Sequence, residues 1–168
     1  MTTQENMIAI EVYKDEYQAQ VIELILDIQQ NEFQVPITIN DQPDLLDVKN
    51  FYCKNNGNFW VAKNGGEIIG TVALIDTSNH QSALRKMFLK TAWRGKEFGI
   101  GQQLLDVLIS WCKEKTINEI YLGTRDQLEA AMRFYLRNGF TEVAVDTLPE
   151  SFPKMAVDNR FFKLVVYE

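Results

Sequence analysis

The chain has few of the residues that build disulfide frameworks and metal sites, with two cysteines and one histidine among 168 residues. Cys53 and Cys112 lie in helix-like stretches, which predicts two thiols without a disulfide and no zinc site. Free thiols are typical of a cytoplasmic protein. His80 lies beside an expected strand connection and is interpreted as an exposed loop residue, with a catalytic role as the alternative.

Long apolar runs and a basic excess are also missing. The longest apolar runs are far shorter than the ~20 residues that a membrane-spanning helix needs. The first residues, MTTQENMIAIEVY, lack the basic and apolar regions of a signal peptide. A net charge of −6 argues against nucleic acid and anionic membranes as partners. With neither repeats nor low-complexity tracts, the sequence predicts one globular domain over residues 1–168.

Hydrophobic periodicity predicts strands that alternate with amphipathic helices. Asp15 is expected to cap the first helix, and Gly139 is expected to end the last helix in a left-handed conformation. Residues 64–66 read as the turn of a β-hairpin. Strands are expected at 7–13, 59–63, 67–76, 82–90, 118–124, after Gly139 and at 161–167, and helices at 15–33, 44–54, 99–113 and 127–137. This order predicts an α/β layer fold with a mixed sheet.

One segment runs against the acidic background. Residues 84–105, LRKMFLKTAWRGKEFGIGQQLL, combine an apolar strand, a basic glycine-containing turn and an amphipathic helix. The first amides of a helix lack intrahelical partners, and the helix dipole adds roughly half a positive charge there. Gly99 and Gly101 remove side chains that would keep an anion away from those amides. The basic residues of this segment are Arg85, Lys86, Lys90, Arg94 and Lys96. The segment therefore predicts a polyphosphate site, although Arg85 and Lys90 also fit a solvated strand face.

Three kinds of phosphate site compete for this turn. A Walker A loop needs GxxxxGK[ST], but Gln102 and Gln103 follow Gly101. A dinucleotide fingerprint needs a third glycine where Leu104 stands. WRGKEFGIGQQLL best resembles the acetyl-coenzyme-A pyrophosphate loop of the GCN5-related N-acetyltransferase (GNAT) superfamily, whose consensus is Q/R-x-x-G-x-G/A at the start of a helix.

A second segment supports this resemblance. AMRFYLRNGF, at 131–140, resembles the family's A-x-x-x-Y-x-x-x-G-F signature, and one helix plus one strand separate the two motifs, as in the family. The resemblance covers residues 59–142 well and the flanks loosely. It implies a GNAT-like acyl-CoA N-acyltransferase fold, with a mixed central sheet of about six to seven strands and about four helices. It also implies acetyl-CoA as cosubstrate without a metal, and a family in which dimers are frequent.

The resemblance implies an N-acetyltransferase that passes an acetyl group directly to a primary amine of a small molecule or peptide. It implies that the diphosphate is held by the amides of about 98–102, and that the pantetheine arm lies along 87–89 like an added strand. An amide near Leu89 is expected to polarise the acetyl carbonyl. The implied cofactor-binding residues are Met87, Phe88, Leu89, Arg94, Gly95, Lys96, Phe98, Gly99, Ile100, Gly101 and Gln102.

Tyr135 is the implied catalytic residue, because a phenol can donate a proton to the thiolate that leaves. Its alternative interpretation is core packing, seven residues after Leu128. The sequence does not identify the base that deprotonates the amine; His80, Glu32 and Glu67 are conceivable, and ordered water can serve instead.

Two positions depart from the family pattern. Lys96 fills the Q/R position while Arg94 stands two residues earlier, and Leu128 stands where many members carry Asn. Because of these departures, a non-catalytic acyl-CoA-binding or regulatory module remains an alternative to the enzyme. A nucleotide-binding protein is the third hypothesis.

Acceptor selection is expected from residues 28–52 and 146–160. Carboxylates in these regions favour a cationic amine, whereas their aromatic side chains could instead line an apolar pocket. The acidic residues are Asp27, Glu32, Asp41, Asp44, Asp47, Asp146, Glu150 and Asp158, and the aromatic ones are Trp60, Phe152, Phe161 and Phe162.

Overall fold

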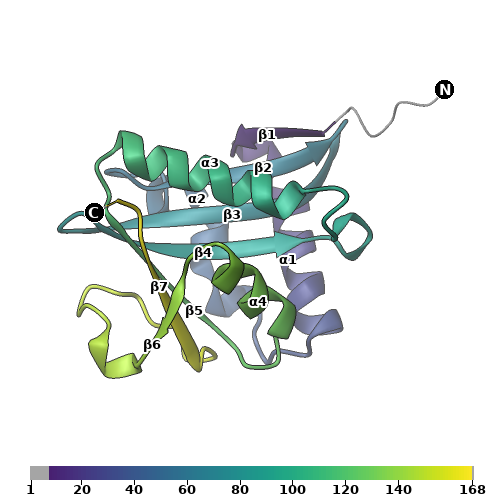
Figure 1. Ribbon diagram of the computed structural model, residues 1–168. Coiled ribbons are helices and arrows are strands. Elements are labelled where there is room, and N and C mark those ends of the chain that lie inside the picture. Colours follow the sequence, from purple (N-terminus) through teal and green to yellow (C-terminus); the bar gives the residue numbers. More distant parts are fainter. Residues whose placement is uncertain (1–7, 168) are drawn as a thin grey trace.

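A computed structural model describes residues 8–167 and arranges seven strands in one sheet (Figure 1). The spatial order is β1-β2-β3-β4-β5-β7-β6. Neighbouring strands are antiparallel except for β4 and β5, which are parallel. The strands are β1 Ile8–Val12, β2 Asn58–Asn64, β3 Glu67–Ser78, β4 Gln81–Leu89, β5 Glu119–Thr124, β6 Thr141–Val143 and β7 Arg160–Val165. The predicted mixed α/β layer fold and its order of elements are confirmed.

Four α-helices accompany these strands within the described chain: α1 Gln18–Leu26, α2 Val48–Phe51, α3 Ile100–Glu114 and α4 Glu129–Arg137. The helix expected at 15–33 forms as a 3-10 turn, then α1, then a π-helical turn at Asp27–Glu32. Asp15 does not cap it: Lys14 occupies the cap position and makes no side-chain hydrogen bond there. The helix expected at 44–54 is shortened to the four residues of α2, because Asp47 has a non-helical backbone.

The sheet has two covered faces. On one, which we call the α3 face, α3 and α4 pack over Leu84, Ile120 and Leu122. On the other, the α1 face, α1 and α2 pack over one half of the sheet, and the 144–159 segment covers Ala83 and Tyr121 in the other half. Figure 1 shows α3 and α4 in front of the strands and α1 behind them.

The parallel ladder between β4 and β5 is short. It holds only the pairs from Gln81 with Glu119 to Ala83 with Tyr121, and then the strands continue without pairing to one another. A sheet that parts in this way leaves the facing backbone edges of both strands without ladder partners. We call this parting of β4 and β5 the split.

A β-bulge distorts β4 beside the split. Arg85 is opposite Ala73 but Phe88 is opposite Thr71, so β4 contains one extra residue, and Lys86 has a φ of +57°. Leu84 and Met87 both pack on the α3 face. The extra residue therefore turns the side chains of both Arg85 and Lys86 toward the α1 face.

Candidate active site

The first turn of α3 presents free main-chain donors. Gly99 precedes it with a φ of +64°, a conformation that glycine adopts without strain. The amides of Phe98 and Gly99 donate to the carbonyl of Gly95, at 3.3 and 3.4 Å. Among the described residues, the amides at 100–102 have no hydrogen-bond acceptor. Three of the five amides expected to face an anion are thus available.

Most of the basic side chains near this turn are engaged elsewhere. Arg94 forms a two-pronged pair with Glu32, at 2.5 and 2.7 Å, and its Nε–H donates to the carbonyl of Leu89 at 2.8 Å. Lys90 pairs with Glu67 at 2.8 Å. Lys96 has no ion pair within residues 8–167. The anion-binding character of the turn therefore rests on amides and Lys96, and a phosphate contact from Arg94 stays a prediction.

The strand expected to guide the pantetheine arm borders the split. Met87 and Leu89 pack toward the α3 face, and Phe88 packs toward the α1 face. Gly101 lies on the same side as Met87: a Cβ at Gly101 would stand 3.9 Å from the Met87 Cε. The start of α3 and this part of β4 therefore border one region on the α3 face, although the Leu89 carbonyl is already occupied.

Tyr135 projects from α4 into the core of the α3 face. Its ring centroid lies 5.5 Å from that of Phe140 and 6.3 Å from that of Phe162. Tyr135 therefore also packs in the core, as its alternative interpretation predicted. Its hydroxyl makes no hydrogen bond with any residue of the described chain. Burial raises the pKa of Tyr135 far above its ordinary value, and the charge of Asp158 raises it further. The phenol is therefore protonated at neutral pH, as a proton donor must be.

On the α1 face, Asp158 reaches the split from the opposite side. A Cβ at Gly123 of β5 would stand 2.6 Å from the Asp158 Oδ2, so the carboxyl group lies directly over that strand. Burial raises the pKa of Asp158 to about 6, against the opposing influence of Arg85, Arg125 and Lys86. The sequence marked Asp158 only as one acidic loop residue, because its neighbours come from strands far away along the chain.

The three bases considered from the sequence are less well placed. The ring Nδ1 of His80 lies 2.9 Å from the carbonyl of Thr116, and His80 is exposed, as predicted. This contact lies at the opposite end of β4 from the split. Glu32 and Glu67 are held by Arg94 and Lys90. Asp158, by contrast, forms no ion pair within the described chain, and its charge acts on Tyr135.

A buried polar network supports the bulge. The Lys86 ammonium contacts Gln42 and lies 3.5 Å from the carboxylate of Asp44, which also accepts a hydrogen bond from the Tyr52 hydroxyl at 2.5 Å. Burial lowers the pKa of Lys86 to about 8, although Asp44 opposes this shift. Asp44 was expected to face an acceptor; instead it neutralises a buried lysine.

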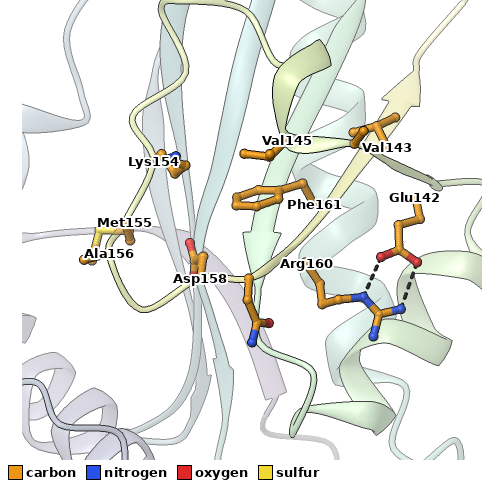
Figure 2. A pocket seen from close by; sticks show the side chains of 11 residues that line it. Glu142, Val143, Val145, Lys154, Met155, Ala156, Asp158, Arg160 and Phe161 are labelled. Carbon is orange, nitrogen blue, oxygen red and sulfur yellow. Dashed lines mark hydrogen bonds and ion pairs between the residues drawn. The ribbon is translucent and has the colours of Figure 1, made fainter.

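A cavity of about 520 Å³ lies beside Asp158, between β6, β7 and the segment that joins them. Figure 2 shows Asp158 and Met155 on one side of it and the pair of Glu142 with Arg160 on the other. The Arg160 Nε lies 2.5 Å from the Glu142 carboxylate. Asp158 is thus reached from solvent through this cavity.

Comparison with known proteins identifies the family of this chain. The model of the acetyltransferase (GNAT) family matches residues 22–140, and the chain therefore belongs to the GNAT acetyltransferase family. This confirms the resemblance drawn from the two motifs. A GNAT acetyltransferase of Staphylococcus aureus Mu50 superposes with a TM-score of 0.91 at 44% identity, over 95% of this chain and 99% of its own.

More distant relatives share the fold or part of the sequence. PaiA N-acetyltransferase of Thermoplasma acidophilum, solved in complex with coenzyme A, has a TM-score of 0.69 at 19% identity, over 94% of this chain and 98% of its own. A probable N-acetyltransferase camello of Xenopus tropicalis is 29% identical over 63% of this chain and 49% of its own length. The chain spans about half the length of the curated relatives it matches.

Three further expectations concern the location, metal content and oligomeric state of the chain. None of the helices within residues 8–167 is long and apolar enough to span a membrane, and the cytoplasmic location stays a prediction. In the same residues, no cluster of three His, Cys, Asp or Glu side chains is placed to hold a metal ion. The dimer that the family suggests is likewise still a prediction.

Proposed function

We propose that this chain is an acetyl-CoA-dependent N-acetyltransferase that transfers the acetyl group to a primary amine within a ternary complex. The proposal rests on family membership and on one structural observation. The amides at the start of α3 are free, and Tyr135 belongs to the same core of the α3 face against which Met87 and Leu89 of β4 pack. Main-chain donors suit a diphosphate, and a protonated phenol beside the split suits a thiolate leaving group.

In this proposal, one group of residues binds acetyl-CoA and Tyr135 donates a proton. The amides at 100–102 and the Lys96 ammonium hold the diphosphate of the cosubstrate by charge and hydrogen bonds. Met87, Phe88 and Leu89 offer the unpaired edge of β4 to the pantetheine arm. Gly95 and Gly99, with φ values of +120° and +64°, give the loop its shape. Tyr135 donates its proton as the carbon–sulfur bond breaks.

A thiol-release assay tests this function. Purified protein is incubated with acetyl-CoA and a panel of primary amines, and free coenzyme A is measured with a thiol reagent. Binding of coenzyme A is measured separately by calorimetry. We expect coenzyme A to bind and at least one amine to be acetylated; absence of both would refute the proposal.

The second candidate is a non-catalytic acyl-CoA-binding module. Two observations favour it: Arg94 is held by Glu32, and Leu128 begins α4 without a side-chain capping bond. This candidate predicts that coenzyme A binds while no amine in a broad panel is acetylated, and that Tyr135→Phe changes nothing.

A further inference from the structure

Three charged side chains face one another on the α1 face of the split without forming ion pairs. Arg85, Arg125 and Asp158 are all half-buried. None has an oppositely charged atom within 4.0 Å among the residues described. Arg94 and Arg160 are half-buried as well, but each holds a carboxylate at 2.5 Å. Uncompensated charges in a half-buried place are costly, and a ligand that pairs with them removes that cost.

All three groups lie around one short turn, residues 155–158. The Arg85 Nη2 lies 3.1 Å from the Met155 Sδ, and the Arg125 Nη1 donates to the carbonyl of Val157 at 2.8 Å. The Asp158 amide donates to the Met155 carbonyl at 3.1 Å, which closes the turn. Both guanidinium groups are thus oriented by neutral atoms, and each keeps N–H donors for another partner.

This turn lies at the split. Asp158 covers Gly123, and both Gly123 and Arg85 belong to the parts of β5 and β4 that no longer pair with one another. Tyr135 approaches the split from the other face and is close enough for the Asp158 charge to raise its pKa. An acceptor bound beside Asp158 would therefore meet a thioester aimed at Tyr135.

The charge balance indicates what kind of acceptor fits. Lys86 also faces this turn, but Asp44 lies 3.5 Å from its ammonium and compensates it. Arg85 and Arg125 then oppose the single carboxylate of Asp158. Two cations and one anion repel a polyamine and match a molecule with an ammonium group next to an anionic one. This differs from the purely cationic acceptor that the loop compositions suggested.

We propose that this turn is the acceptor site and that it binds a primary amine carrying a carboxylate, as a free amino acid does. Arg85 and Arg125 hold the carboxylate, and Asp158 holds the ammonium and takes its proton. The inference rests on the proposed function and names the substrate class of the same site.

The step balances. Asp158 accepts one proton from the ammonium, and the free amine nitrogen forms a bond to the acetyl carbon. The carbon–sulfur bond breaks, and the thiolate takes the proton of Tyr135. The nitrogen loses its second proton as it becomes an amide, and this proton returns Tyr135 to the phenol through water. The first proton, on Asp158, passes to solvent. No oxidant, metal or further reactant is needed.

Three matched acceptors test the recognition of the carboxylate: phenylalanine, phenylalaninamide and phenethylamine, with spermidine as a polycation. They keep the amine while the carboxylate is neutralised or removed. We expect kcat/KM for phenylalanine to exceed that for each of the others at least tenfold. Equal or better use of the amide or of spermidine would overturn the proposal.

Single variants test whether Arg85 and Arg125 recognise the carboxylate of the acceptor. Arg85→Gln and Arg125→Gln are each expected to raise the KM for phenylalanine at least tenfold and to leave the KM for acetyl-CoA within twofold. Arg133→Gln is the matched control, because Arg133 is exposed on α4, and it should change neither constant. Arginine variants that discriminate among the acceptors as well as the unchanged chain would refute the assignment.

Asp158→Asn separates proton transfer from binding. It is expected to lower kcat at least a hundredfold with all acceptors and to abolish the fall in kcat/KM below about pH 6 that the unchanged enzyme should show. A retained acidic limb would exclude Asp158 as the proton acceptor. A merely structural role would not remove this limb selectively.

A direct binding measurement distinguishes failure of this inference from failure of the proposed function. Calorimetry with coenzyme A present measures phenylalanine binding to the unchanged chain and to Arg85→Gln. If no acceptor is acetylated but phenylalanine binds only to the unchanged chain, the acceptor site is supported and the proposed catalytic function is refuted. If amines are acetylated but phenylalanine neither binds nor reacts, the proposed function is supported and the inferred carboxylate-binding acceptor site is refuted.

Discussion

The ammonium of Lys86 and the carboxylate of Asp44 lie 3.5 Å apart, and their side chains are only 4% and 6% exposed. The pair joins the bulge of β4 to the segment before α2, so it couples the wall of the split to the chain that covers the α1 face. Burying two charges is costly unless each has partners, and here Gln42 and Tyr52 supply the additional hydrogen bonds.

Lys86→Met is expected to lower the free energy of unfolding by about 3–5 kcal/mol, because it leaves Asp44 as an uncompensated buried charge. Urea denaturation followed by circular dichroism measures it. Asp44→Asn and the double variant complete a cycle, and the double variant should lose less than the two single losses combined. Additive losses would show that the two groups do not interact.

The pKa of Asp158 predicts an unusual pH dependence of stability. Burial raises this pKa from 3.8 to about 6, so between these values the native chain holds a proton that the unfolded chain has released. The free energy of unfolding therefore falls as the pH rises through this window, and the cost persists above it.

Asp158→Asn removes that cost. It is expected to stabilise the protein by about 1–3 kcal/mol at pH 7 to 8 and to have little effect near pH 3.5. Thermal melts across this pH range measure the difference. A loss of stability at neutral pH would mean that Asp158 is stabilised by its arginine neighbours more than it is penalised by burial.

Gly101→Val is expected to raise the KM for acetyl-CoA about tenfold or more, because its methyl groups would cover the free amides at the start of α3. A Cβ at this position meets only ordinary contacts, 3.9 Å from Met87 and Phe134, so the fold should tolerate the change. Steady-state kinetics measure it. Gly66→Ala is the control, since a Cβ there meets no atom within 4 Å. Unchanged kinetics in Gly101→Val would place the diphosphate elsewhere.

Tyr135→Phe is expected to reduce kcat roughly 10²-fold or more while changing the affinity for coenzyme A little. The Phe ring keeps the contacts with Phe140 and Phe162, and the hydroxyl makes no hydrogen bond within residues 8–167 that the variant could lose. Stability should therefore be unchanged. Parallel losses of turnover and affinity would indicate a packing role.

The sequence predicts the parts of this fold that depend on local patterns. The turn at 64–66, the inner stripe of α3 and the left-handed end of α4 at Gly139 all follow from residue types and short spacings, and the structure has each of them. The four-residue length of α2 and the π-helical turn after α1 could not be predicted, because tertiary packing decides how far a helical pattern extends.

The candidate site was only partly predictable for a similar reason. The free amides at 100–102 follow from a glycine motif that is contiguous in the chain. The environment of Asp158 is made by Arg85 in β4, Gly123 in β5 and Arg125 just after β5, all more than 30 residues away in sequence. The bulge at Lys86 gives no signal in the strand pattern, and so the burial of this lysine was not expected.

The parting of β4 and β5 has a consequence for the order of events. The proposed donor site lies on the α3 face and the proposed acceptor site on the α1 face, so the two molecules would reach the unpaired edges of β4 and β5 from opposite sides. Either substrate can then bind first. Steady-state kinetics should show a random-order mechanism, with intersecting lines in double-reciprocal plots.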